Sequence, residues 1–314
     1  MSHPYSLLVL KFGGASLATP ARIRRAARRV SWLRARGHDV VVVASAVGET
    51  TDKLLALSNR VRSAKHVLSG SEGSEVRGAS APGSPHPTPP DFGPRTSHLG
   101  APRETDRILA TGEDLAAALL ASAITAQGTH ARSLRGGEAG LLATGDFGAG
   151  VLLDLALSPI LDLLRAQVVP VVSGFQAIRV HDGETVTLGR GTSDLTAVFL
   201  AAKLRAAECH LIKDVDGVYD SDPHQFAAAQ RHSTLSYEAL SVIAATSEIV
   251  HVGAARLARE SGVRLRIYGY RAPNKITEEH CTMVGIESGA LKGAATGGAT
   301  TGAAATGSTV GEAA

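Results

Sequence analysis

One glycine-broken segment of the chain, Thr185-Val-Thr-Leu-Gly-Arg-Gly-Thr-Ser-Asp-Leu-Thr-Ala197, combines a cation, a carboxylate and several small hydroxyl residues ahead of a predicted helix. Glycines let the backbone approach an anionic ligand closely, and the first N–H groups of a helix, from Ser193 onward, can donate to it. Arg190 can hold a carboxylate through paired hydrogen bonds, and Asp194 can organise neighbouring cations. This combination is typical of a phosphoryl-transfer site. Taken alone, the segment also fits a capped turn in which Ser193 or Asp194 is the helix N-cap.

Two further segments repeat the arrangement of a buried strand followed by glycine. The run Leu7-Leu-Val-Leu-Lys-Phe-Gly-Gly-Ala-Ser16 ends in Lys11 and the pair Gly13 and Gly14, which predicts a mobile cation and an open backbone at the end of a strand. The run Asp39-Val-Val-Val-Val-Ala-Ser-Ala-Val-Gly-Glu-Thr-Thr-Asp52 is a β-branched strand followed by a turn and a helix start. Open α/β sheets bind their ligands at this carboxyl edge.

A third segment, Cys209-His-Leu-Ile-Lys-Asp-Val-Asp-Gly-Val-Tyr-Asp-Ser-Asp-Pro223, also ends a short strand with charged residues. It delivers Lys213, Asp214 and Asp216 to a glycine turn. Tyr219 follows as a flat apolar surface on which a purine could lie. The sequence therefore predicts that several strands bring cations and carboxylates to one edge of a sheet.

The elements that must position these residues alternate as βαβ units do. We expect strands near 130–134, 168–173 and 264–268, a hairpin over 176–188 that turns at Asp182-Gly183, and helices near 112–127, 152–165, 193–205, 236–245 and 254–260. This pattern predicts an α/β fold with a mainly parallel sheet and helices on both faces.

Two regions lack the apolar side chains that a packed core requires. Residues 69–104 are rich in Pro, Gly and Ser, and residues 289–314 form an Ala/Gly/Thr tract. Such segments bury too little surface to order themselves. We therefore expect one domain over residues 1–288 with a disordered insertion at 69–104, and a disordered tail after it. A lid over the substrate is an alternative role for the insertion.

Composition narrows the class of protein. A hydrophobic content of 44% suffices for a core, and the formal net charge is only +3. The basic residues of 22–36 fall at helical spacing without interleaved aromatics, which favours a solvated helix face over nucleic-acid binding. The two cysteines, Cys209 and Cys281, are expected in strands as buried thiols, and no metal site is indicated. We find no apolar run of membrane-spanning length and no secretory pattern, so we expect a cytoplasmic protein without membrane partners.

The ordered motifs resemble those of the aspartokinases, within the amino acid kinase superfamily. The motifs, in chain order, are Lys11-Phe-Gly-Gly14, Ser45-Ala-Val-Gly-Glu-Thr-Thr-Asp52, Thr111-Gly-Glu113, Leu188-Gly-Arg-Gly-Thr-Ser-Asp194 and Asp214-Val-Asp-Gly-Val-Tyr219. The resemblance covers residues 7 to about 288. It implies a three-layer α/β/α sandwich and transfer of the γ-phosphoryl group of ATP to the side-chain carboxylate of L-aspartate, which gives 4-phospho-L-aspartate.

The resemblance also implies a role for each matching residue. Lys11 would contact the transferring phosphoryl oxygens, and Asp194 would hold Lys11 in place. Arg190 would bind the α-carboxylate of the substrate and Glu113 its ammonium group. Alone, Glu113 also fits a charge at a helix N-terminus. The other substrate-binding residues would be Ser45, Thr51 and Ser193, and the nucleotide site would comprise Gly13, Gly14, Lys213, Asp214, Asp216 and Tyr219. Mg²⁺ would be carried mostly by the ATP phosphates, with no dedicated protein ligands.

Several positions depart from the family pattern. Ala15, Lys213 and His224 differ from the usual residues, and Glu248 stands where a lysine contacts the ATP phosphates. A carboxylate there would repel phosphate. Three explanations remain open: Lys213 supplies the cation, Glu248 faces solvent, or the chain has lost catalysis or acts on another acceptor.

Two alternatives to aspartate phosphorylation therefore stand. The chain could be a kinase for another small carboxylate, carbamate, phosphate or phosphonate, or a catalytically weak paralogue that binds ligands or acts as a regulatory subunit. No ACT domains follow the kinase domain, so feedback regulation of that type is not expected. The apolar helix over 115–124 has more apolar surface than one core face requires, which predicts a homodimer.

Overall fold

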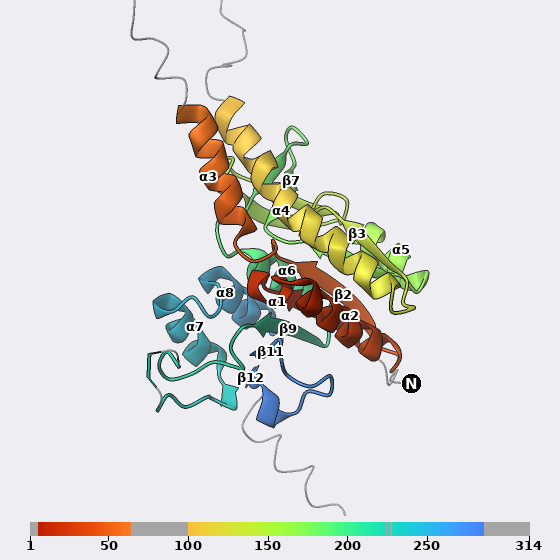
Figure 1. Cartoon of the computed structure of the whole chain (residues 1–314), viewed down its shortest axis with the longest axis vertical. Helices are drawn as coiled ribbons and strands as arrows, with labels where there is room; N and C mark the ends of the chain where they lie inside the picture. The colour runs from red at the N-terminus through yellow and green to blue at the C-terminus, as the bar shows by residue number, and fades with distance from the viewer. Residues whose placement is uncertain (1–5, 64–99, 224, 227, 286–314) are drawn as a thin grey trace, which may run out of the picture.

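The structure, a computed structural model, describes residues 6–63, 100–223, 225–226 and 228–285. The predictions for residues 69–99, for His224 and for the tail at 289–314 lie outside the described residues. Within them, helices cover both faces of a central sheet, and a smaller sheet lies along one long helix (Figure 1). The predicted α/β class and the three-layer α/β/α arrangement with a mainly parallel sheet are confirmed.

The central sheet is parallel except where its strand β12 runs antiparallel to β11. In spatial order its strands are β10 (Thr234–Leu235), β12 (Thr282–Val284), β11 (Leu265–Gly269), β9 (Glu208–Lys213), β1 (Leu7–Phe12), β2 (Asp39–Ala44), β6 (Val169–Ser173) and β3 (Ala131–Leu134). The central strands β1 and β2 are buried on both faces, which explains why they read as continuous apolar runs.

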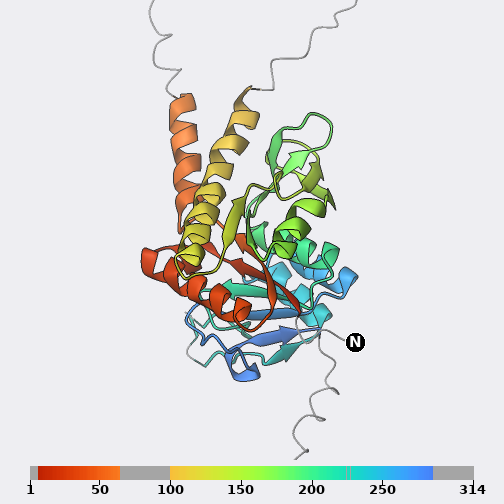
Figure 2. The same cartoon turned by 90° about the vertical axis from the view of Figure 1, so that its right-hand side faces the viewer.

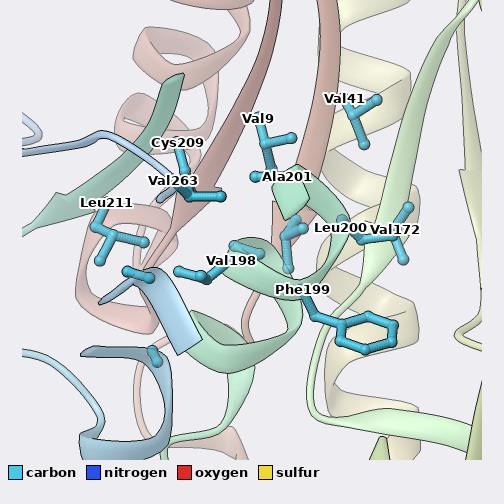
Figure 3. Packing of buried hydrophobic residues seen from close by; sticks show 14 of the residues in the cluster. Val9, Val41, Val172, Val198, Phe199, Leu200, Ala201, Cys209, Leu211 and Val263 are labelled. Atoms are coloured by element: carbon cyan, nitrogen blue, oxygen red, sulfur yellow. The ribbon is translucent and has the colours of Figure 1, made fainter. Parts of the chain in front are cut away.

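Alternate residues of these strands enter two separate cores. Leu8 and Leu10 of β1 pack in one hydrophobic cluster, whereas Val9 packs in the other. One face of the sheet carries α1 (Gly14–Leu17), α2 (Pro20–Arg34) and α4 (Gly100–Thr125), and the other carries α5 (Ser158–Arg165), α6 (Ser193–Lys203), α7 (Tyr237–Thr246) and α8 (Val252–Ser261). Figure 3 shows Val198, Leu200 and Ala201 of α6 in the same hydrophobic cluster as Val9, Val41 and Val172 of the sheet. The helix that begins at the glycine-broken segment is therefore fixed by the core.

The smaller sheet has four strands in the order β5 (Val151–Leu155), β4 (Leu141–Thr144), β7 (Gln176–Arg179) and β8 (Thr185–Thr187). It lies beside α4, as Figure 2 also shows. Buried Asp106 of α4 ties this sheet to the helix, because its carboxylate accepts hydrogen bonds from Gly148 N at 2.8 Å and from Thr187 N and Oγ1 at 2.8 and 2.9 Å. The predicted hairpin over 176–188 is confirmed.

The predicted start of the long helix was wrong. We expected it at residue 112, but α4 begins at Gly100, so residues 100–104 are helical and the Thr111-Gly-Glu113 motif lies in the middle of the helix. We expected the helix to begin at Gly112 because glycine is unfavourable inside a helix. Packing of α4 against α2 and against α3 (Thr50–Ser63) provides the tertiary contacts that let the helix continue through Gly112.

A second error concerns residues 152–165, which we expected to be one helix. The first part is the strand β5, and only Ser158–Arg165 is helical. Leu-rich strands and helices share the same apolar residues, and the pairing partner of β5, the strand β4, was not predicted. The short strands β10 and β12 were missed as well, and Cys281 lies just before β12 rather than in a strand.

Our expectation that no apolar segment has the length of a membrane span also needs correction. Within the described residues, one helical stretch, Pro102–Thr125, has the length and the mean hydropathy, 1.4, of a membrane span. Half of its 18-residue window is buried inside this fold. Such burial is also typical of the core helix of a globular domain, so the stretch is weak evidence for a membrane span.

Candidate active site

The carboxylate of Asp194 lies between two lysine side chains at the carboxyl edge of the central sheet. Lys11 near the end of β1 places Nζ 2.8 Å from Asp194 Oδ1, and Lys213 at the end of β9 places Nζ 2.6 Å from Oδ2. The two strands are hydrogen-bonded neighbours. The three side chains are almost fully buried, at 8%, 4% and 12% exposure for Lys11, Asp194 and Lys213. Two cations therefore share one carboxylate.

The glycines of the preceding turn explain why Asp194 is in this position. Gly189 and Gly191 have φ angles of +92° and +76°, which side-chain-bearing residues rarely adopt. Thr192 is the N-cap of α6, and its Oγ1 donates to Gly189 O at 2.7 Å. Asp194 is thus the second residue of the helix and not its cap. Its carboxylate is left to bind the lysines.

The charges in this cluster depend on one another. Burial alone would raise the pKa of Asp194, but the charges and hydrogen bonds of Lys11 and Lys213 outweigh it and hold that pKa well below its usual range. Burial and the nearby Lys11 charge lower the pKa of Lys213, while Asp194 opposes the shift. Asp194 is therefore ionised at neutral pH and unsuited to act as a base.

A cavity of about 530 Å³ opens onto these three residues. Its wall also contains Arg190 and Gly191 from the turn, and Glu248 and His251 from the segment before α8. Glu248 is solvent-exposed, yet it lines the same cavity as the lysines. Three cations thus face a space large enough for a phosphate chain, with one carboxylate at its exposed side.

His251 is a lining residue that the sequence reasoning did not assign to the site. Its backbone N–H lies 3.4 Å from Asp194 Oδ2, and its Nδ1 accepts a hydrogen bond from Gly253 N at 3.1 Å as the N-cap of α8. Burial lowers its pKa. Because Nδ1 accepts a hydrogen bond, the neutral ring carries its proton on Nε2. A histidine one residue before an apolar helix is the only sequence signal for this cap.

Glu113 is a buried carboxylate close enough to Lys11 to interact with its charge. Its Oε1 accepts a hydrogen bond from Ala46 N at 3.2 Å, next to Ser45, while Oε2 has no hydrogen-bond partner among the described residues. Burial raises its pKa to about 7, although the Ala46 N–H and the charge of Lys11 oppose this shift. Since Glu113 lies in the middle of α4, it is not a charge at a helix N-terminus. An unpaired buried carboxylate is suited to bind a cationic group.

Close backbone packing shapes the space between these groups. A Cβ added at Gly14 would lie 2.7 Å from Ala46 O, so the turn after β1 can approach Ala46 only without a side chain. Gly13 donates its N–H to Ile212 O at 3.2 Å. Ser193 is buried beside Gly174.

Arg190 lies on the exposed side of the cavity, with 72% of its side chain accessible. Its guanidinium forms an ion pair with Asp52, near the start of α3. Thr51, the preceding residue, is half-buried. Arg190 therefore already binds a carboxylate, as the residue type predicts, but this carboxylate belongs to the chain itself.

Three of the six residues predicted to contact a nucleotide line a separate cavity of about 340 Å³. Asp214, Asp216 and Tyr219 line it, and the Tyr219 hydroxyl donates to Asp216 Oδ1 at 2.5 Å. Lys213 precedes Asp214 directly, so the β9 strand end joins the two cavities. Among the described residues, no group of three or more His, Cys, Asp or Glu side chains could hold a metal ion.

Comparison with known proteins yields consistent matches. The model of the Amino acid kinase family matches residues 6–269. The aspartokinase of Corynebacterium glutamicum is 34% identical over 294 residues, which cover 93% of this chain and 62% of that protein. An aspartate kinase structure from Synechocystis has a TM-score of 0.65 at 30% identity and covers 89% of this chain and 40% of that chain.

A further solved structure, E. coli aspartokinase III in complex with aspartate and ADP, has a TM-score of 0.68. Its 21% identity, with coverage of 88% of this chain and 64% of that one, supports similarity of fold. The chain spans about three fifths of the length of the Corynebacterium relative.

Proposed function

The chain belongs to the amino acid kinase family, and we propose that it transfers the γ-phosphoryl group of ATP to the side-chain carboxylate of L-aspartate. The observation that carries this proposal is the buried Lys11–Asp194–Lys213 cluster, which opens onto a cavity with Arg190. The similarity to aspartokinases over most of the chain favours aspartate as the acceptor. The binding of aspartate and ADP by E. coli aspartokinase III supports the same pair of ligands.

The two lysines would bind and neutralise the phosphoryl oxygens. An ammonium group has three N–H donors; Lys213 donates one to Asp194 Oδ2 and Lys11 forms an ion pair with Oδ1, which leaves donors for a ligand in the cavity. Asp194 fixes both ammonium groups before substrate binds, so their positions need no reorganisation during the reaction. Gly13 and Gly14 would let phosphate approach the backbone at the end of β1.

The acceptor would bind between Glu113 and Arg190. The free Oε2 of Glu113 would accept a hydrogen bond from the ammonium group of aspartate, and Arg190 would exchange Asp52 for the α-carboxylate. Ser45, Thr51 and Ser193 would complete this pocket. A side-chain carboxylate oxygen then attacks the γ-phosphorus, the bond to the ADP oxygen breaks, and ADP leaves with the electron pair. No proton is transferred, so no general base is required.

The nucleoside would occupy the second cavity, on Tyr219, between Asp214 and Asp216. Mg²⁺ would arrive with the ATP phosphates, which would carry most of its ligands. Lys213 would face the junction between nucleoside and phosphates.

Glu248 is the observation that favours a second candidate function. Its carboxylate lines the proposed phosphate cavity, where it would weaken ATP binding. Lys213 offsets this charge from the neighbouring strand, and the solvent exposure of Glu248 allows water and salt to screen it. If these effects are insufficient, the chain is a weak paralogue or acts on another acceptor.

Hydroxylamine trapping of an acyl phosphate tests the proposal. The chain is incubated with MgATP and either L-aspartate, L-glutamate or no acceptor. We expect hydroxamate with aspartate only. Lys213→Met should remove most of the signal, whereas Lys203→Met, which removes a lysine from an exposed ion pair at the far end of α6, should not. Hydroxamate with glutamate alone, or none from the unmodified chain, would contradict the proposal.

We further propose a homodimer formed through α3 and α4. Both helices expose apolar pairs at i, i+4 spacing, namely Leu57 with Val61 and Leu115 with Leu119. These side chains are 42% to 68% exposed, whereas Leu120 and Ile124 of α4 are buried in the core.

A cytoplasmic location also remains a proposal, supported by the burial of half of the apolar window of α4.

Light scattering tests the assembly. We expect twice the chain mass at micromolar concentration and one chain mass for Leu115→Glu/Leu119→Glu. The matched variant Val151→Glu/Leu153→Glu changes an equally exposed apolar pair on β5 and should remain dimeric. A single chain mass for the unmodified protein would exclude the dimer.

A further inference from the structure

A third cavity, of about 400 Å³, lies at the opposite edge of the central sheet. It is lined by the first residues of β1, β9 and β11, by α2 and by residues 274–276. Glu208 in its wall and Lys213 at the phosphoryl site are the two ends of β9, so the cavities are about 17 Å apart along the strand. None of the residues assigned to phosphoryl transfer lines this cavity.

One carboxylate, Glu208, lines the cavity, and the protein already neutralises it. Arg266 donates Nε and Nη2 to Glu208 at 2.6 and 2.9 Å, and His210 Nε2 lies 3.1 Å from Oε2. Burial alone would raise the pKa of Glu208, but these partners lower it to about 2. His210 is buried and in turn hydrogen-bonded to the Tyr268 hydroxyl at 3.0 Å. This network is satisfied within the protein.

The remaining charged groups of the cavity wall are cations that have no carboxylate partner in the part of the chain that the structure describes. Arg29 is only 2% exposed, donates Nη2 to Ala272 O at 2.6 Å and places its guanidinium 4.9 Å from the Tyr268 ring centroid. Its Nη1 has no hydrogen-bond partner among the described residues. A buried charge is costly unless an opposite charge compensates it, so an anion in this cavity would be stabilised.

Two exposed cations extend the positive charge of this cavity. Arg264 donates Nε to a backbone oxygen, that of Ala207, at 3.3 Å, and Lys275 is exposed beside it in the cavity lining. Neither has an ion-pair partner among the described residues. Because these side chains are solvent-accessible, they can contact a ligand directly.

Much of the remaining wall is apolar or aromatic, beside the polar residues Ser6, His38 and Asn274. Trp32, Leu33 and Ile276 line the cavity together with Leu8 and Tyr268. The volume of about 400 Å³ falls within the usual range of small-molecule sites, about 300–1,000 Å³. A fully polar anion such as inorganic phosphate would leave these apolar surfaces unused. A ligand with both an anionic group and an apolar body would use both parts of the wall.

We propose that this cavity is a binding site for a small organic carboxylate with an aromatic or apolar body. The carboxylate would lie toward Arg29, Arg264 and Lys275, and the apolar body would pack against Trp32 and Leu33. An ammonium group on the ligand would find no free carboxylate in the wall, because the Glu208 oxygens are occupied. The site therefore selects anions over zwitterions.

Trp32, the single tryptophan of the chain, provides a reporter inside this cavity. Its fluorescence is titrated with phenylacetate, with the neutral isostere phenylacetamide and with acetate, which lacks the apolar body. We expect a saturable change with phenylacetate, and binding at least about tenfold weaker for phenylacetamide and for acetate, which corresponds to about 1.4 kcal/mol. Calorimetric titration with the same three probes checks that the optical signal reports binding.

Variants at the exposed cations test the assigned positions without risk to the core. Arg264→Gln/Lys275→Gln should weaken phenylacetate binding at least about fivefold, because charge-assisted hydrogen bonds are lost. Arg24→Gln/Arg28→Gln removes two exposed cations from α2 that do not line the cavity and should bind as the unmodified chain does. Equal affinity for phenylacetate and phenylacetamide, an unaffected Arg264/Lys275 variant, or no saturable signal would overturn the proposal.

Discussion

Each edge of the central sheet carries a largely buried carboxylate that is held by two basic side chains, but the partners differ. At the carboxyl edge, Asp194 binds the ammonium groups of Lys11 and Lys213. At the amino edge, Glu208 binds the guanidinium of Arg266 and the neutral ring of His210. The first cluster carries excess positive charge and retains unused N–H donors, whereas the second is neutral and saturated. The carboxyl edge is therefore suited to bind phosphate, and the Glu208 network to hold the fold together.

Asp194→Asn should produce the largest effect on this contrast. The amide is isosteric but uncharged, so the two lysines repel each other and lose their fixed positions. We expect hydroxamate formation to fall by about a hundredfold to a thousandfold, the usual effect of losing a preorganised electrostatic group. Asp162→Asn, in an exposed ion pair on α5, is the matched control and should keep its activity. Near-normal turnover by Asp194→Asn would mean that the lysine cluster is structural only.

Glu208→Gln, at the amino edge, should lower the stability of the fold rather than the catalytic activity. Removing one partner of a buried pair costs about 3 kcal/mol, which chemical denaturation would measure as a lower unfolding free energy. The pH dependence has a defined sign. Because folding lowers the pKa of Glu208 from 4.5 to about 2, its contribution is present above pH 4.5 and is lost as the pH falls toward 2. As the pH falls over this range, the free energy of unfolding should decrease less steeply for Glu208→Gln than for the unmodified chain. Acid unfolding curves of the same slope for the two proteins would refute the assigned role of Glu208.

Glu113 extends the comparison to the acceptor side, because it is a buried carboxylate with one oxygen that has no hydrogen-bond partner among the described residues. Burial raises its pKa to about 7, so the ionised form that binds an ammonium group appears as the pH rises through neutrality. We expect the KM for aspartate to fall over this range, and Glu113→Gln to raise KM about tenfold and remove the pH dependence. The stability of the fold has the opposite trend. Because the folded state favours the protonated Glu113 carboxyl, the contribution of this residue to the free energy of unfolding decreases as the pH rises from 4.5 toward 7. A pH-independent KM in the unmodified chain would exclude this role.

Glu248→Lys should give the smallest effect. The side chain is exposed, so solvent and salt screen its repulsion of phosphate, and we expect the KM for ATP to fall by no more than about fivefold. A similar change at Glu260, exposed on α8 outside the cavity, serves as control. A rise in activity of a hundredfold or more would show that Glu248 dominates the site and that Lys213 does not offset it.

The sequence predicted the elements whose signals are local. Apolar runs, glycines and turn residues identified β1, β2, β9, α6 and the 176–188 hairpin, and the strand ends placed Lys11 and Lys213 at one edge. Long-range packing determined the rest. The extension of α4 back to Gly100 and the pairing of β5 with β4 depend on partners far away in the chain.

The candidate active site likewise has some features that local sequence predicted and others that depend on long-range packing. The residue types at Asp194 and Arg190 indicated ion pairing, but the second lysine on Asp194 and the Asp52 partner of Arg190 required the fold. The hydrogen bond from His251 N to Asp194 also depends on how α8 meets α6. No sequence signal marked the amino-edge cavity, because its wall combines α2, β1, β9 and β11.

The most direct test of the central claim follows the oxygen atoms. L-Aspartate labelled with ¹⁸O in its side-chain carboxylate is incubated with the chain, MgATP and hydroxylamine, and the released phosphate is analysed by ³¹P NMR. If the carboxylate oxygen attacks the γ-phosphorus at the Lys11–Asp194–Lys213 site, cleavage of the acyl phosphate leaves one ¹⁸O in the phosphate, and Asp194→Asn abolishes this signal. Unlabelled phosphate alone would contradict the account, because it would show that ATP is hydrolysed or that another atom is the acceptor.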